Sequence, residues 1–142
     1  MKIPPKIVER IIRNNAVGII YNFDSEDQKE FIDRIQKDNH IIIDGKGAFT
    51  PDMLRNRISY YLKIKNMSWN MLPILIPGKM IAITNADMIK IGFARVFEDF
   101  KRNRIPLLLL LNKDTNMVNI RNFHTYQTSM IIEYDYSKMK KV

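Results

Sequence analysis

The sequence contains no cysteine and only two histidines, His40 and His124. The missing thiols exclude disulfide bonds, cysteine nucleophiles and zinc sites of the cysteine type. Two imidazoles are too few to build a histidine-based metal site. We therefore expect a chain that works without a metal ion or another cofactor.

Long hydrophobic runs are also missing. The longest, residues 107–111, has the length of a buried strand and falls far short of the ~20 residues that cross a bilayer. The first residues, Met1-Lys2-Ile3-Pro4-Pro5, lack the apolar segment and the cleavage site of a signal peptide. These features predict an intracellular, cytoplasmic protein with no membrane partner.

The length of 142 residues fits one α/β domain that buries its own core. Within it we expect an N-terminal helix in residues 1–15, a core over 16–136 and a basic tail over 137–142. The chain carries 23 basic and 15 acidic residues, a formal net charge of +8. This excess favours polyanions or acidic protein surfaces without choosing between them. A lysine- and isoleucine-rich composition set by an AT-rich genome explains it equally well.

Short apolar runs alternate with helical patterns along the chain. Strands are expected at 17–23, 41–43, 80–84, 107–111 and 130–134. Helices are expected at 3–14, 26–37 and 51–64, and another is expected to begin at Asp87, whereas 65–78 reads as irregular. The alternation predicts a three-layer α/β fold: a mostly parallel five-stranded sheet with helices on both faces and a P-loop NTPase-like topology.

A phosphate-binding loop is missing where the first strand ends. That loop needs glycines, whose amides approach the anion, and a lysine followed by Ser or Thr. The corresponding stretch, residues 21–28 (YNFDSEDQ), contains no glycine and no lysine. Asp24, Glu26 and Asp27 instead place carboxylates at the positive end of the following helix. The pattern predicts a well-capped helix start that repels nucleotides.

Acids that could hold magnesium are missing at the third strand as well. Its end carries the neutral Thr84 and Asn85, and Asp87 comes three residues late, as a helix cap would. The fourth strand ends in Asn112-Lys113-Asp114-Thr115, which differs from the guanine-reading signature of GTPases in the position of its aspartate. Neither end predicts nucleotide hydrolysis.

The order of elements resembles the core of AAA+ ATPases of the clamp-loader type. The likeness runs from about residue 17 to 136, through the strand before Asn112, the loop containing Ile120-Arg121-Asn122-Phe123 and the closing strand at 130–134. It implies that Asn112 occupies the polar sensor position and that this is a degenerate, non-hydrolysing relative. The chain stops where the family's helical lid would begin. The implied role is a non-catalytic accessory module in DNA replication or repair, which binds a protein partner, such as an AAA+ or replication protein, or nucleic acid. Its oligomeric state is left open.

A second, weaker likeness is to barstar-like inhibitors. It rests on Ile43-Asp44-Gly45, Trp69-Asn70-Met71-Leu72 and Asn85-Ala86-Asp87, in that order. The basic charge of this chain differs from the acidic binding surface usual in those inhibitors. This likeness also implies binding without catalysis.

The enzyme alternative is a metal-dependent nuclease of the PD-(D/E)xK type. Asp44-Gly45-Lys46 has the required acid-x-lysine form after an apolar strand, and Asp24 would supply the second metal ligand. Such enzymes place these residues on adjacent strands, whereas a helical segment separates them here. A simple turn at Asp44-Gly45-Lys46 is the competing interpretation.

Basic residues gather around the fourth strand and the helix before it, and Lys138, Lys140 and Lys141 form the basic tail. If the fold brings several together, they could contact phosphates, with Phe123 or Tyr126 nearby for stacking. A solvated basic face is the competing interpretation. The expected nucleic-acid or partner-binding set is Arg95, Lys101, Arg102, Arg104, Lys113 and Arg121.

Overall fold

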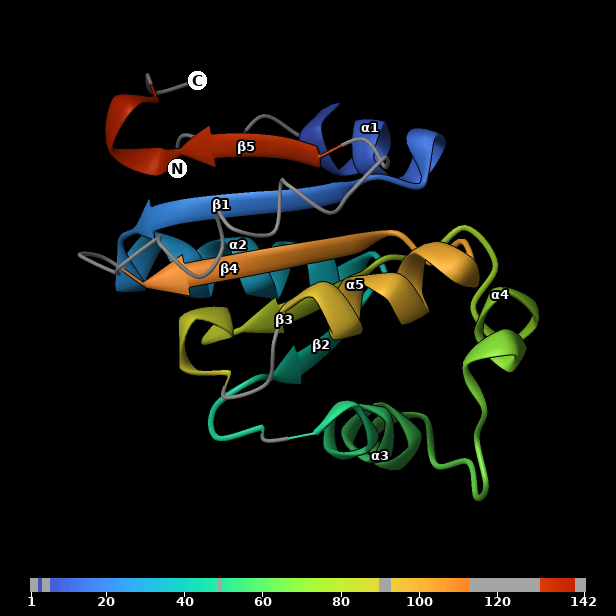
Figure 1. Ribbon diagram of the computed structural model, residues 1–142. Helices are drawn as coiled ribbons and strands as arrows, with labels where there is room; N and C mark the ends of the chain where they lie inside the picture. Colours follow the sequence, from blue (N-terminus) through green and yellow to red (C-terminus); the bar gives the residue numbers. More distant parts are fainter. Residues whose placement is uncertain (1–2, 4–5, 49, 90–92, 113–130, 140–142) are drawn as a thin grey trace.

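The computed structural model describes residues 3, 6–48, 50–89, 93–112 and 131–139 (Figure 1). Five strands and five α-helices make up most of this part of the chain. The strands are β1 (Val17–Phe23), β2 (Ile41–Asp44), β3 (Ile81–Thr84), β4 (Leu107–Asn112) and β5 (Ile131–Asp135). The helices are α1 (Lys6–Asn14), α2 (Ser25–Lys37), α3 (Pro51–Leu62), α4 (Leu72–Leu75) and α5 (Phe93–Arg102), with short 3-10 turns at Trp69–Met71, Ala86–Met88 and Tyr136–Lys138.

The strands form one sheet in the order β2-β3-β4-β1-β5, and every neighbouring pair is parallel. The chain therefore starts near one edge, crosses to β2 at the other edge, and returns through β3 and β4 before passing β1 to reach β5. This arrangement confirms the predicted fold class, a three-layer α/β fold around a five-stranded sheet. All five predicted strands are present within a residue or two of their expected bounds.

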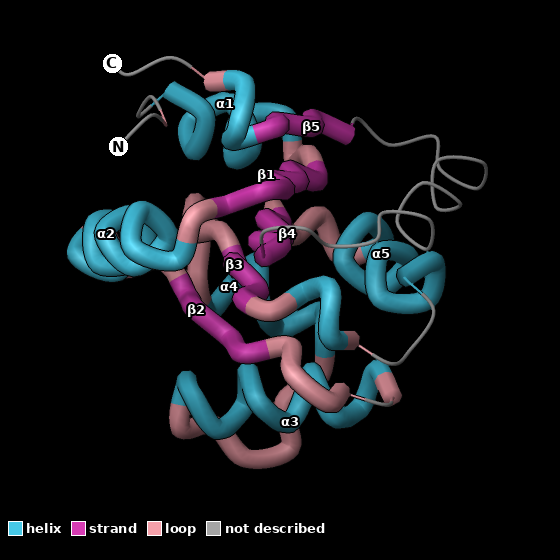
Figure 2. The backbone as a smooth tube through the Cα atoms, turned by 90° about the vertical axis from the view of Figure 1, so that its left-hand side faces the viewer, coloured by secondary structure: helices cyan, strands magenta, loops and turns pink. Residues whose placement is uncertain are grey.

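Helices cover both faces of the sheet, and each face has its own core. On one face, Ile7 and Ile11 of α1 and Phe31 and Ile35 of α2 pack over alternate strand residues such as Leu108. On the other face, α3, α4 and α5 supply Leu54, Ile58, Leu72 and Phe100. Figure 2 shows α2 and α5 on opposite sides of the strands. The split follows from the reversal of direction at β2, because crossovers between parallel strands keep one hand.

Local capping explains where the two best-predicted helices begin. Asp24 caps α2 through its carboxylate, as the sequence predicts. Thr50 caps α3 by accepting the Met53 N–H at 3.2 Å, and Pro51 occupies the first helical position, where no amide donor is needed. Leu54 and Ile58 then face the core, as their four-residue spacing predicts.

Two predictions about helix positions need correction. The segment 65–78, expected to be irregular, contains the 3-10 turn Trp69–Met71 and the single-turn helix α4, which buries Leu72. Asp87 does not begin a long helix, because it lies inside the 3-10 turn Ala86–Met88 and α5 begins only at Phe93. The 3-10 turn ends at Ile89, whose extended conformation, with φ of −70° and ψ of 133°, interrupts the helical path.

Candidate functional site

Because all five strands are parallel, their carboxyl ends share one edge of the sheet. In open α/β sheets, ligands bind in the crevice beyond this edge, at the point where the strand order reverses. Here that point is β1, which has β4 on one side and β5 on the other. The carboxyl edge is therefore the first place to look for a site.

At β1, the start of α2 is closed by carboxylates. One oxygen of Asp24 accepts the N–H of Glu26 at 2.9 Å and that of Asp27 at 3.3 Å. These amides are among those that an anion would use at a helix N-terminus. Asp27 in turn accepts a short hydrogen bond from the Tyr136 hydroxyl. The prediction of a capped helix start is confirmed, and two of the terminal donors are already satisfied.

At β2, β3 and β4, a chain of polar side chains joins the strand ends. The Asn85 side-chain amide donates to Asp44 at 3.0 Å, and the Asn112 side-chain amide donates to Asn85 at 2.9 Å and to Asp87 at 3.1 Å. The Asn112 backbone N–H also donates to Asp87, at 3.2 Å. These four residues, the edge network, hold the three strand ends together across the positions where a ligand would enter.

The charge state of Asp44 is fixed by this network. Burial would raise the pKa of its carboxyl group, but hydrogen bonds from Asn85 and from the Lys46 N–H, with the nearby charges of Arg57 and Lys46, lower the pKa below its ordinary value. Asp44 is therefore an ionised hydrogen-bond acceptor and not a proton donor near neutral pH.

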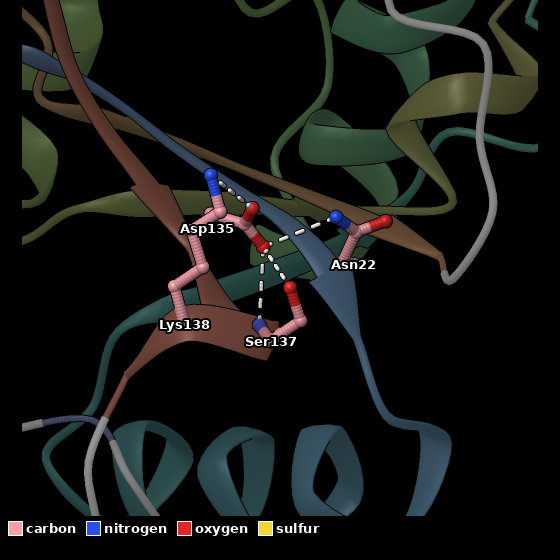
Figure 3. Close-up of polar contacts among 4 residues, drawn as sticks. All are labelled: Asn22, Asp135, Ser137 and Lys138. Atoms are coloured by element: carbon pink, nitrogen blue, oxygen red, sulfur yellow. Dashed lines mark hydrogen bonds and ion pairs between the residues drawn. The ribbon is translucent and has the colours of Figure 1, made fainter.

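A second polar group ties β5 to β1 (Figure 3). Asp135 accepts from the Asn22 side-chain amide at 3.1 Å, and from the hydroxyl and N–H of Ser137 at 2.6 and 3.1 Å. The hydrogen bonds from Ser137 and then Asn22 hold the pKa of Asp135 below its ordinary value. Asn22 has φ of 56° at a shift in the β1–β4 register, so the side chain leaves the regular strand path at this point. The hydrogen bonds of Asp135 with Asn22 and Ser137 therefore join β5 to β1 and indicate a structural role.

The turn interpretation of Asp44-Gly45-Lys46 is confirmed. Asp44 accepts the Lys46 N–H at 2.9 Å, which is the hydrogen bond of an Asx turn. Gly45 is needed at this point, since a Cβ there would stand 2.8 Å from Cγ2 of Ile83. A small residue is therefore required by packing between β2 and β3.

The two acids of the nuclease alternative lie at separated strand ends. Asp24 follows β1 and Asp44 ends β2, with β3 and β4 between them. Three strand spacings amount to roughly 14 Å, whereas ligands of one metal ion stand roughly 2 Å from it. Among the described residues, no group of three His, Asp or Glu side chains is arranged to hold a metal ion. This geometry does not favour the nuclease alternative.

The structure describes the side chains of only three of the six basic residues that were predicted to bind nucleic acid or a partner. Lys101, Arg102 and Arg104 are exposed at the end of α5, which leads into the beginning of β4. They therefore belong to the amino edge of the sheet, opposite the edge network. Arg102 pairs with Glu98 at 2.9 Å across one helical turn. The fold places Arg95 within α5, and its side chain, like Lys113, Arg121, Phe123, Tyr126, Lys140 and Lys141, lies outside the described part of the chain.

Sequence reasoning missed the role of Asp87 and the pairing of Asn85 with Asn112. Asp87 stands three residues beyond β3, follows Asn85 in its left-handed conformation and accepts a hydrogen bond from Asn112. The available signal was an asparagine immediately after a buried strand, a residue type that tolerates this conformation better than most.

No protein-family model matches this sequence, and no curated protein matches it. The fold defines the chain as a three-layer α/β protein with an all-parallel five-stranded sheet, and side chains at the carboxyl edge of this sheet hydrogen-bond to one another. Among the described helices, none has the length and apolar character needed to span a membrane.

Proposed function

We propose that this chain is a non-catalytic, AAA+-like accessory module that acts inside the cell by binding a protein partner, nucleic acid or both, in DNA replication or repair. The observation that carries the proposal is the occupied carboxyl edge. Asp24 takes the amides at the start of α2, and the edge network fills the ends of β2, β3 and β4.

The contact at Asn112 gives the AAA+ likeness a structural rationale. In that family the third strand carries the magnesium-binding acids and the fourth ends in a polar sensor residue. Here Asn112 ends β4 and donates to Asn85 and Asp87, which follow β3. The contact of Asn112 thus resembles that of a sensor residue. The magnesium-binding acids of the family are replaced at the end of β3 by the neutral Thr84 and Asn85.

The basic end of α5 supports nucleic acid as one ligand. Lys101, Arg102 and Arg104 are exposed and lie within four residues of one another, and one of them, Arg102, pairs with Glu98. Basic side chains that contact DNA phosphates release bound counterions, which favours binding with little dependence on the DNA sequence.

Binding to a short DNA duplex at low salt tests this part of the proposal. The triple variant Lys101→Gln, Arg102→Gln, Arg104→Gln should bind about tenfold more weakly and show a shallower salt dependence, because three phosphate contacts are removed. The matched control is Lys6→Gln, Arg10→Gln, Arg13→Gln on α1, which removes the same charge from another surface. Equal affinity of wild type and the α5 variant would reject this site.

A cleavage assay separates the proposal from the nuclease alternative. DNA incubated with the chain and Mg²⁺ or Mn²⁺ should remain intact. Cleavage that is lost in Asp44→Ala but retained in Asp33→Ala, an exposed residue of α2, would contradict the non-catalytic proposal.

A further inference from the structure

The edge strand β2 borders a pocket of about 980 Å³ that shares only Asp44 with the edge network. Ile42, Ile43 and Asp44 line its strand side, and α3 with the following residues up to Asn66 lines the other. Figures 1 and 2 both show α3 running beside β2 at this end of the sheet. We call this pocket the β2–α3 groove.

One side of β2 has no strand partner among the described residues. Ile41 and Gly45 donate their N–H groups to Met80 and Thr84 on the β3 side, at 3.1 and 2.7 Å. Because backbone groups alternate along a strand, the N–H groups of Ile42 and Asp44 and the C=O of Ile42 point outward, toward the groove. The outward C=O of Asp44 is already taken by Arg57, at 2.6 Å. Three backbone groups thus remain for an incoming strand.

The groove is also basic and partly apolar. Arg57, Lys63 and Lys65 line it, and the carboxylate of Asp44, its one acid, is held by Asn85 and the Lys46 N–H. Ile42 and Ile64, which are partly exposed, contribute apolar surface. Tyr60 is 88% exposed and Tyr61 43%, so two large rings stand at the groove with much of their surface in water. Such rings are common anchors in protein interfaces.

The charge of the groove and its outward backbone groups favour one kind of ligand over the others. A second copy of this chain would bring three more cations to the groove, and each copy carries +8, so self-association through this edge is opposed. An extended acidic peptide complements the charge, and its backbone can complete the outward hydrogen bonds of Ile42 and Asp44. Nucleic acid would match the charge but would leave the alternating backbone groups without a strand to pair with.

We propose that the β2–α3 groove binds an extended, acidic segment of a partner protein, which adds to the sheet as a strand next to β2. Alternate acidic side chains of that segment face Arg57, Lys63 and Lys65 on the α3 side, where the two tyrosines also lie, and its apolar side chains lie next to Ile42 on the opposite face of the sheet. This inference rests on the proposed binding function and specifies its protein partner by chemistry.

Selection from a random library of ten-residue peptides on the intact chain tests the inference. Selected peptides should be acidic with alternating apolar residues. Two groove variants should weaken their binding at least about fivefold. Ile42→Pro removes the outward N–H at an edge-strand position that tolerates proline, and Lys63→Gln with Lys65→Glu reverses the charge. The control Lys6→Gln with Arg13→Glu makes the same charge change on α1 and should bind as wild type does.

Hydrogen exchange gives a second readout that a loss of folding would not imitate. The bound peptide should protect the amides of Ile42 and Asp44 in the wild-type chain. An empty selection, or peptides that bind wild type and both groove variants equally, would overturn the inference. A dT oligonucleotide that binds in place of peptides and is lost in the Lys63/Lys65 variant would make the groove a nucleic-acid site. That result overturns the peptide inference but leaves the proposed binding function standing, because the α5 variants test that function separately.

Discussion

Asn112 is the residue on which the carboxyl edge depends most. Its side chain and backbone together reach Asn85 and Asp87, so it links the end of β4 to the turn that follows β3. Deleting one member of a partly buried polar network leaves its partners unsatisfied, which costs more than the hydrogen bond itself contributes.

We expect Asn112→Ala to lower the free energy of unfolding by about 1–3 kcal/mol. Urea denaturation of wild type and variant measures the change. The control is Asn14→Ala, which removes an exposed hydrogen bond to the carbonyl of Arg10 within α1 and should cost much less. A cost for Asn112→Ala no larger than that of the control would show that the edge network contributes little.

His40 makes stability depend on pH. It is buried, its Nδ1 accepts the Met80 N–H at 3.1 Å, and burial together with the nearby Lys79 holds its pKa below the ordinary value of 6.5. In the unfolded chain the imidazole takes up a proton at a higher pH than in the folded chain. The stabilising contribution of neutral His40 is therefore complete above 6.5 and is lost as the pH falls below that value.

We expect the free energy of unfolding to fall between about pH 7 and pH 5 in wild type and to stay flatter in His40→Asn. Asparagine keeps an acceptor oxygen near the position of Nδ1 but does not titrate. Asp44 and Asp135 do not affect this pH range, because their lowered pKa values mean that the stability they contribute is lost only at more acidic pH. Equal slopes for the two proteins would exclude His40 as the cause.

At the scale of elements, the N-terminus of α2 has the acidic side chains that oppose phosphate binding. Its cap is made by Asp24, and Glu26 and Asp27 follow in the first turn. These acids stabilise the helix through its dipole and also place negative charge where a nucleotide phosphate would bind. One local feature thus explains both the helix and the expected lack of nucleotide binding.

We expect Asp24→Ala to destabilise the chain by about 1 kcal/mol, and Asp24→Ser to recover most of that loss because serine also caps helices. Thermal denaturation compares the two, with Asp33→Ala as the control for loss of one exposed carboxylate from the same helix. Equal stability of Asp24→Ala and Asp24→Ser would argue against the capping role.

The elements were readable from the sequence because their signals are local. Asp24 and Thr50 mark helix starts, and the run at 107–111 marks a buried strand. The short helix α4 was missed because Pro73 and Pro77 dominate the pattern around it. Asp87 was misplaced because its partner Asn112 is 25 residues away, and a side-chain contact between β3 and β4 depends on strand order, which local pattern does not encode.

At the scale of the whole molecule, the two ends of the sheet carry different side chains. The carboxyl edge is closed by Asp24 and the edge network, whereas the basic end of α5 lies at the amino edge. The β2–α3 groove lies along the outer strand and was not predicted, because Lys63 and Tyr60 become neighbours of Ile42 only when α3 packs beside β2. The two surfaces that we propose for binding, the basic end of α5 and the β2–α3 groove, therefore both differ from the ligand site that is usual in open α/β sheets.

The most direct measurement is the thermal stability of the intact chain with and without ATP and Mg²⁺. A ligand that binds only the folded state at a hundred times its Kd stabilises that state by about 2.7 kcal/mol, which raises Tm by several degrees. We expect millimolar ATP to leave Tm unchanged in the wild-type chain. A rise of several degrees, accompanied by protection of the Ser25 and Glu26 amides from hydrogen exchange, would contradict the account, because it would put phosphate where Asp24 now caps α2.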